Sequence, residues 1–167
     1  MSPAIIRPAR TRDVRVIRSL IDEYSVDGHL LAKATVTLFE DIQEFVVAEI
    51  DGTVVGCGAL HVMWEDLGEV RTLAVSGAHL RQGLGSMILN ELLQRARNIG
   101  IRRVFCLTFM VGFFSEHGFV EIGEAPVEHD VYEQLLQSYD EGVAEFLGLE
   151  RVKPNTLGNH RMLLELA

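Results

Sequence analysis

The sequence predicts a single mixed α/β domain, in which a meander of antiparallel strands precedes strands joined by helical crossovers. Two observations predict this class. Apolar, β-branched runs alternate along the chain with segments of helical periodicity, and Asp51-Gly52 between two such runs is a strong hairpin signal. The length of 167 residues is that of one ordinary domain. We therefore expect residues 1–167 to form one domain.

The first half of the chain predicts two helices and four strands. Thr11 is a plausible N-cap, because Asp13 follows in the first turn and apolar residues then recur at helical spacing. The elements expected here are a strand over Ala4–Pro8, a helix after Thr11, a helix over about Thr35–Glu44, and strands over Phe45–Ile50, Thr53–Val62 and Glu69–Val75.

The second half contains the strongest helical pattern of the chain, over Gly83–Asn98, which Gly100 is expected to end. Its predicted apolar stripe consists of Leu84, Met87, Ile88, Leu92, Ala96 and Ile99. The further elements expected are a strand over Arg102–Thr108, a short helix over Gly112–His117, a strand over Phe119–Ile122, a helix from about Glu128 with a continuation near Gly142–Leu147, and a last strand over Arg161–Leu166.

Composition excludes several classes of protein. The net charge of −9 makes the chain a poor non-specific binder of nucleic acid or anionic membrane, so we expect neither as a partner. No apolar stretch approaches the length of a membrane span. The six histidines show no metal-ligand spacing, so no metal site is expected. Cys57 and Cys106 lie in apolar runs and are expected to be buried, reduced thiols, which favours a cytoplasmic location.

One segment is a candidate ligand-binding site. The strand ending at Val75 leads through a loop into Leu80-Arg81-Gln82-Gly83-Leu84-Gly85-Ser86 at the start of the long helix. Glycines two apart let the backbone approach a ligand closely, and the free N–H groups of the first helical turn favour an anion. The segment is neither a Walker loop nor a dinucleotide fingerprint, because the further residues of those motifs are missing. Glycine pairs at helix starts are common, so a phosphate site and a simple helix start both stay open on this segment alone.

The chain resembles the GNAT superfamily of acetyl-CoA-dependent N-acetyltransferases. Four segments match in order, namely "LAV", "RQGLGS", "RARNIGIRRVFCLT" and "FFSEHGF". The resemblance implies a mixed, mostly antiparallel sheet of six to seven strands flanked by helices, with acetyl-CoA as cosubstrate. Longer matches, including "GHLLAKATVTLFEDIQEFVVAE" and "VKPNTLGNHRMLLEL", are similar to short, single-domain amino-acid N-acetyltransferases of the N-acetylglutamate synthase type. These imply direct transfer to the α-amine of L-glutamate or L-glutamine, the first step of arginine biosynthesis. By analogy with the superfamily, a homodimer is expected.

The resemblance also implies roles for individual residues. Glu69 holds the general-base position. Thr108 lies where relatives carry a serine or threonine near the sulfur atom of CoA. Lys33, Arg71, Lys153 and Asn159 are the candidate substrate contacts. Glu69, Arg71 and Leu73 are expected to share one face of their strand, because side chains alternate. The cofactor is expected to contact the strand and loop residues Leu73, Ala74, Val75, Arg81, Gln82, Gly83, Leu84, Gly85 and Ser86.

Two positions depart from the superfamily pattern. The usual arginine or glutamine of the phosphate loop is Leu80, with Arg81 displaced by one residue, and the usual tyrosine acid is Phe114. Each candidate also has a plain structural interpretation. Glu69 could be a solvated carboxylate, Arg71 half of a surface ion pair, Thr108 an ordinary strand residue, and Lys153 and Asn159 parts of a simple loop.

Two other functions remain open from the sequence. The first is acetylation of a different amine, such as a polyamine, a drug or a protein N-terminus. The second is a non-catalytic acyl-CoA sensor, which the missing tyrosine leaves open and the presence of Glu69 opposes. Replacing Glu69 by glutamine distinguishes catalyst from sensor, because a catalyst loses turnover while it keeps acetyl-CoA binding.

Overall fold

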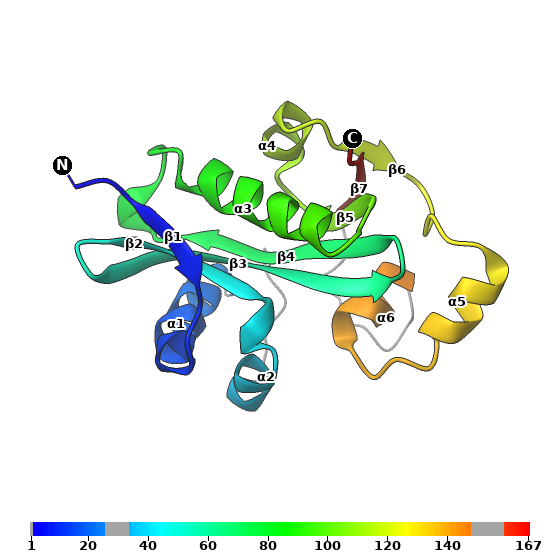
Figure 1. Ribbon diagram of the computed structural model, residues 1–167, viewed down its shortest axis with the longest axis horizontal. Helices are drawn as coiled ribbons and strands as arrows, with labels where there is room; N and C mark the ends of the chain where they lie inside the picture. Colours follow the sequence, from blue (N-terminus) through cyan, green and yellow to red (C-terminus); the bar gives the residue numbers. More distant parts are fainter. Residues whose placement is uncertain (1, 26–33, 148–158) are drawn as a thin grey trace.

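The protein is described here by a computed structural model covering residues 2–25, 34–147 and 159–167. Seven strands form one sheet in the order β1-β2-β3-β4-β5-β7-β6 (Figure 1). All neighbouring strands pair antiparallel except β4 and β5, which are parallel. This arrangement confirms the predicted mixed, mostly antiparallel sheet. The strands are β1 (Ile5–Pro8), β2 (Phe45–Ile50), β3 (Thr53–Trp64), β4 (Leu67–Val75), β5 (Arg103–Thr108), β6 (Val120–Ile122) and β7 (His160–Glu165).

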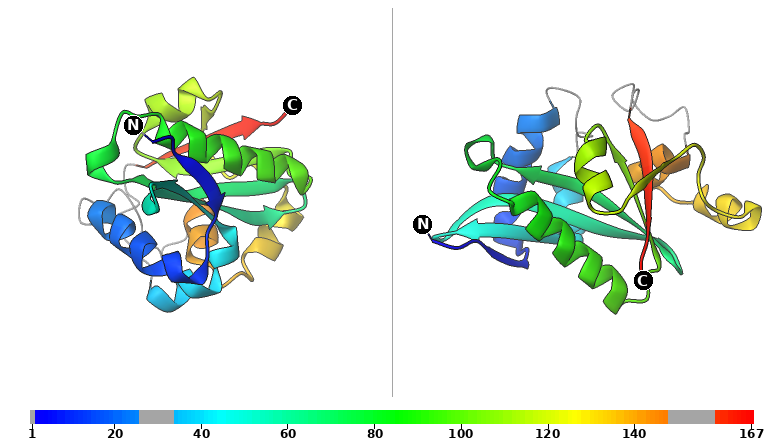
Figure 2. Two further views of the ribbon diagram at one scale, coloured as in Figure 1. Left: turned by 60° about the vertical axis from the view of Figure 1, so that its left-hand side comes forward. Right: turned by 90° about the horizontal axis from the view of Figure 1, so that it is seen from above.

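Helices cover both faces of the sheet. Figures 1 and 2 show α3 lying across one face and α1 and α2 on the opposite face. The helix α6 lies near the end of the sheet where the β3–β4 turn projects (Figure 1). The helices are α1 (Val14–Ser25), α2 (Thr35–Glu40), α3 (Leu84–Asn98), α4 (Val111–Glu116), α5 (His129–Leu135) and α6 (Glu141–Leu147), with 3-10 turns over Thr11–Asp13, Ile42–Glu44 and Gly77–His79.

The tight turn between β2 and β3 forms where the sequence predicts it. Asp51 and Gly52 have φ angles of 48° and 79°, both in the left-handed region. Two consecutive residues of this kind give the backbone twist that suits a two-residue hairpin. The turn fixes the register that pairs Ile50 with Thr53.

The N-terminal helices differ in detail from the prediction. Thr11 is the first residue of a 3-10 turn, and Arg10 occupies the N-cap position. The carboxylate of Asp13 accepts a hydrogen bond from the Arg10 amide at 2.7 Å and pairs with Arg7 at 2.8 Å. This acidic side chain therefore satisfies the start of the helix in place of Thr11. The helix expected over Thr35–Glu44 is divided at Asp41 into α2 and a 3-10 turn.

The long helix packs more broadly than the predicted stripe. Leu84, Ile88, Leu92 and Ala96 are buried as expected. Met87 and Ile99 are exposed instead, Ile99 because it lies just past the helix end. Their places in the core are taken by Leu89 and Leu93. A helix lying flat on a sheet buries two adjacent rows of side chains, so the buried face is wider than a single stripe.

The close contact of α3 with the sheet depends on glycine in β3. A Cβ atom added to Gly58 would lie 2.7 Å from Ile88 Cγ2 and 3.0 Å from Leu92 Cδ1. A separate apolar cluster joins α5 and α6 to the sheet, and the rings of Phe105 and Phe146 meet edge to face at 4.7 Å within it. This cluster places the start of α6 beside the first half of β4.

Candidate active site

The two parallel strands at the centre of the sheet pair along only part of their length. The pairing of β4 with β5 joins Leu67–Glu69 to Arg103–Phe105. Beyond it, β4 runs on to Val75, while the end of β5 pairs with β7 on its other side. Glu69 is therefore the last β4 residue in this pairing, and it stands where the two strands part.

A bulge changes the side-chain alternation of β4 directly after this point. Thr72 has a φ angle of 58°, and the register with β3 moves from Ala59 opposite Arg71 to Cys57 opposite Ala74. An extra residue of this kind reverses which face later side chains occupy. Leu73 packs against the apolar core residues on the α3 face of the sheet, whereas Glu69 and Arg71 lie on the opposite face. The prediction that Leu73 shares a face with those two residues was therefore wrong.

The glycine-rich segment forms an exposed turn at the N-terminus of α3. Arg81 and Gly83 have φ angles of 62° and 79°, and Gly83 is the N-cap. The Gly83 carbonyl accepts the hydrogen bond of the Met87 amide at 3.1 Å. The amides of the intervening first turn, Leu84, Gly85 and Ser86, are the ones that an α-helix leaves without a partner inside the helix.

This turn fits the phosphate groups of a nucleotide cofactor. Left-handed residues beside a helix start turn successive amides toward one point, and the helix dipole adds to the attraction for an anion. A Cβ atom at Gly85 would lie 3.5 Å from the Phe113 ring, an ordinary contact, so the packing against α4 does not itself require glycine there. The exposed side chain of Arg81 can add a charge-assisted contact.

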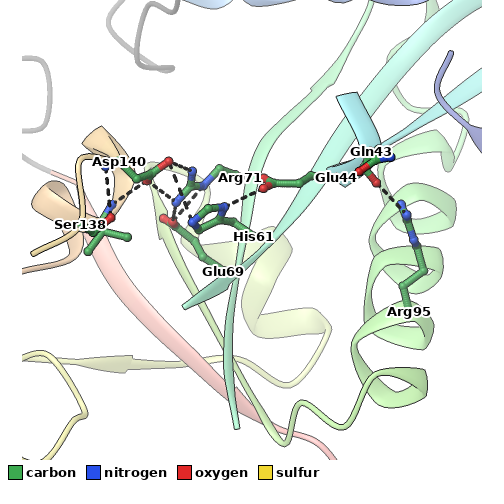
Figure 3. Close-up of polar contacts among 9 residues, drawn as sticks. Gln43, Glu44, His61, Glu69, Arg71, Arg95, Ser138 and Asp140 are labelled. Atoms are coloured by element: carbon green, nitrogen blue, oxygen red, sulfur yellow. Dashed lines mark hydrogen bonds and ion pairs between the residues drawn. The ribbon is translucent and has the colours of Figure 1, made fainter. Parts of the chain in front are cut away.

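Glu69 is buried and ion-paired, not solvated. Its carboxylate Oε1 accepts hydrogen bonds from Arg71 Nη2 at 2.6 Å and Nε at 3.0 Å (Figure 3). Arg71 is itself buried, with 9% of its side chain exposed. The two residues share a face of the strand, as predicted, and form a buried pair and not a surface pair.

The ion pair extends to residues that the sequence analysis did not select. Asp140, just before α6, accepts a hydrogen bond from Arg71 Nη1 at 3.0 Å, and its Oδ1 lies 3.0 Å from Nη2. His61, opposite Glu69 on β3, has its Nδ1 2.8 Å from Glu44 and its Nε2 3.9 Å from Asp140 (Figure 3). We refer to Glu44, His61, Glu69, Arg71 and Asp140 as the charged cluster.

Burial and charge oppose each other in this cluster. Burial alone would raise the pKa of Asp140, but the hydrogen bond and charge of Arg71 lower it to about 2. Burial alone would lower the pKa of Arg71, but the carboxylates of Glu69 and Asp140 raise it above its usual range. Burial, followed by the charge of Glu69, raises the pKa of the Cys106 thiol well above its usual value. Arg71 and Asp140 are therefore both charged at neutral pH, whereas the thiol of Cys106 is neutral.

The other predicted site residues lie at the ends of strands or outside the described residues. Thr108 ends β5, is buried, and its Oγ1 accepts a hydrogen bond from the Met110 amide at 2.8 Å. Asn159 is half-buried and directly precedes β7. Lys33 and Lys153 lie outside the described residues. Phe114, at the position of the usual tyrosine, is buried in the core.

Two further findings concern metal binding and membrane insertion. Within residues 2–25, 34–147 and 159–167, no group of three or more histidine, cysteine or acidic side chains is arranged to hold a metal ion. No helix in the described part of the chain is long and apolar enough to cross a membrane.

Comparison with known proteins agrees with this fold. The chain belongs to the GNAT family of acetyltransferases, whose model matches residues 14–119. It is 54% identical to an amino-acid acetyltransferase of Mycobacterium tuberculosis, over 97% of this chain and 94% of that protein. A Mycobacterium tuberculosis structure solved in complex with CoA and NLQ matches with a TM-score of 0.94 and 54% identity, covering 98% of this chain and 99% of that one.

Longer relatives match over part of their length. The N-acetylglutamate synthase of Neisseria gonorrhoeae, solved with coenzyme A and N-acetyl-glutamate, has a TM-score of 0.80 at 28% identity, covering 100% of this chain and 36% of that one. An amino-acid acetyltransferase of Neisseria meningitidis is 38% identical over 71% of this chain and 28% of its own length. These comparisons confirm the resemblance found in the sequence, both to the superfamily and to the N-acetylglutamate synthase type.

Proposed function

We propose that this protein transfers the acetyl group of acetyl-CoA to the α-amine of L-glutamate or L-glutamine, the first step of arginine biosynthesis. The position of Glu69 carries the proposal. A buried carboxylate stands where β4 and β5 part, on the strand that leads into the phosphate-binding turn. The named activity of the Mycobacterium tuberculosis relative and the N-acetyl-glutamate in the Neisseria gonorrhoeae structure support an acidic amino acid or its amide as acceptor.

Acetyl-CoA supplies an activated acetyl thioester, and the chain offers it two contiguous surfaces. The main chain of Leu73, Ala74 and Val75 follows the bulge, beyond the part of β4 that pairs with β5. The segment Arg81–Ser86, with Gln82 exposed at its tip, supplies amides and one positive charge for the phosphates. Main-chain amides suit a chain with a net charge of −9, because they attract phosphate without many cationic side chains.

Glu69 is the group that we assign to proton removal. An α-ammonium group must lose a proton before it can attack a thioester, and a positioned carboxylate can accept it directly or through water. Among the described residues, the hydrogen bonds that Glu69 accepts end on Oε1. The other oxygen, Oε2, is therefore the one that we assign to the proton.

The remaining catalytic groups are assigned by position. A main-chain amide within Leu73–Val75 is the expected donor to the thioester oxygen as charge develops there. Thr108 is assigned to the region of the sulfur, because it ends β5 on the other side of the opening between β4 and β5. Its hydroxyl oxygen already accepts the Met110 amide, which leaves its O–H free to donate.

Acceptor contacts are assigned to Lys33, Lys153 and Asn159, as the sequence predicts. The clamp predicted for Arg71 stays a prediction, and its guanidinium is already engaged by two carboxylates. We also propose that residues 1–167 act as one acetyltransferase domain, which the single sheet from β1 to β6 supports. A homodimer and a cytoplasmic location remain expectations, and the two buried free cysteines favour a reducing compartment.

Release of free CoA thiol from acetyl-CoA tests the proposal. The assay is run against the twenty amino acids, spermidine and a peptide mixture. Saturable turnover with glutamate or glutamine alone supports the proposal. Turnover only with spermidine or peptides would leave a GNAT enzyme and refute the proposed acceptor. Binding of acetyl-CoA without turnover on any amine would indicate a sensor.

Glu69→Gln tests the assigned base. We expect kcat to fall by about 100-fold or more, with the KM for acetyl-CoA retained, because only the proton acceptor is lost. The matched control is Glu65→Gln, an exposed glutamate in the turn before the same strand. Thermal unfolding of both variants shows whether the change is one of folding, since Glu69 also pairs with the buried Arg71.

A further inference from the structure

Asp140 is a half-buried carboxylate that pairs with the same arginine as the proposed base, and no function assigned above uses it. We propose that Asp140 is a positioning residue for catalysis, which holds Arg71 in place and shares its charge so that Glu69 remains able to accept a proton. The inference rests on the proposed role of Glu69. It places the start of α6 among the elements that determine the rate of acetyl transfer.

The contacts show that one guanidinium serves two carboxylates. Arg71 Nη2 lies 2.6 Å from Glu69 Oε1 and 3.0 Å from Asp140 Oδ1. Arg71 Nε bonds to Glu69, and Nη1 bonds to Asp140, each at 3.0 Å. The guanidinium therefore cannot move toward one carboxylate without leaving the other. This arrangement fixes the direction in which Glu69 presents its second oxygen.

The first turn of α6 is built to receive the guanidinium. Asp140 Oδ1 accepts the Val143 amide at 2.9 Å, so the carboxylate is held by its own helix as well as by Arg71. A Cβ atom at Gly142 would overlap Arg71 Nη2 and lie 2.6 Å from Arg71 Cζ. Only glycine lets the guanidinium lie against this turn, so residues 140 and 142 form a seat for it.

The electrostatic effect on Glu69 follows from the count of charges. Paired with one carboxylate alone, a buried arginine strongly favours the ionised form of that carboxylate and makes it a poor proton acceptor. A second carboxylate on the same guanidinium opposes this effect. The charged groups near Glu69 on this face of the sheet are Arg71 on the same strand, His61 with Glu44 behind it, and Asp140, whereas Cys106 packs on the α3 face.

Asp140→Asn in the full chain tests the inference. The amide keeps the shape of the side chain but removes its charge, so the full charge of Arg71 acts on Glu69. We expect the acid limb of the pH profile of kcat/KM for the amino acid to move down by about one pH unit. We expect kcat at pH 7 to fall about threefold to tenfold, with the KM for acetyl-CoA unchanged.

Gly142→Ala provides a second test that removes no charge. Its methyl group displaces the guanidinium from the seat, and we expect kcat to fall while the KM for acetyl-CoA is unchanged. The matched control is Asp130→Asn, an exposed aspartate in α5, which should leave the pH profile as it is. If Asp140→Asn does not fold, the Gly142→Ala variant decides.

If Asp140 has only a structural role, Asp140→Asn will lower the melting temperature but leave kcat per folded enzyme and the acid limb of the pH profile unchanged. That result would overturn the inference. The test also separates this failure from failure of the proposed function. If Glu69→Gln retains full turnover, the assignment of the base is wrong, and the role of Asp140 falls with it. If Glu69→Gln loses turnover while both seat variants keep kcat and the acid limb, only the positioning role is wrong.

Discussion

Replacing Arg81 by glycine would separate the backbone of the phosphate-binding turn from its side chain. Arg81 has a φ angle of 62°, and this conformation costs a non-glycine residue about 1 kcal/mol or more. Glycine removes this strain but has a more flexible unfolded state, so we expect a net gain of at most about 1 kcal/mol. For a chain of this size, that gain raises the melting temperature by about 2–4 °C.

The same substitution should weaken the binding of acetyl-CoA. Loss of one charge-assisted contact at an exposed site removes about 1–1.5 kcal/mol, which corresponds to about a tenfold higher KM. The KM for the amino acid should stay the same. Thermal unfolding and steady-state kinetics measure the two effects separately.

The matched control is Asp51→Gly. Asp51 also has a positive φ, 48°, but lies in the exposed turn between β2 and β3. It should show at most a small gain in stability and no change in KM. An unchanged KM in Arg81→Gly would refute the phosphate contact, and a lower melting temperature would refute the backbone reasoning.

Three further predictions concern packing, pH and thiol reactivity. Gly58→Ala should destabilise the protein by about 1–3 kcal/mol in urea unfolding, because its methyl group would overlap Ile88, and an unchanged midpoint would contradict this. Asp140 has a pKa lowered to about 2, so its stabilising contribution is present above pH 4 and is lost as the pH falls from about 4 to 2. The stabilities of wild type and Asp140→Asn should therefore differ at pH 7 and converge near pH 2, and a constant difference would argue against the ion pair. Cys57 and Cys106 are buried, so neither should react with a thiol reagent at pH 8 in the native protein, and both should react in urea. Rapid native labelling would show that one of them is accessible.

Local patterns predicted most of the fold because each element has its own signal. The hairpin at Asp51-Gly52 and the glycine at position 100 act over a few residues, and both form as expected. The errors arise where tertiary packing decides. Leu89 and Leu93 are buried instead of Met87 because α3 lies flat against the sheet. The sequence alone does not show which side of a helix will face the sheet.

The candidate site was predicted unevenly for a similar reason. The turn proposed to bind phosphate is continuous in sequence, so its glycines are enough to predict it. His61 gave no such signal, because regular pairing from the turn would place Val62 opposite Glu69, and only a register shift between Val62 and Trp64 brings His61 there. Asp140 had no such signal, because it lies 69 residues after Arg71 and meets it only through the packing of α6. Leu73 was assigned to the wrong face because regular alternation does not predict a bulge.

The bulge at Thr72 divides β4 into two segments that can change independently. Up to Arg71, the odd-numbered side chains face α6 and the charged cluster, and after the bulge Leu73 and Val75 face α3. Substitutions that adapt the first segment to a new acceptor would not reach the packing that shapes the cofactor surface. The residues proposed to meet the acceptor can therefore change while those that shape the cofactor surface stay the same.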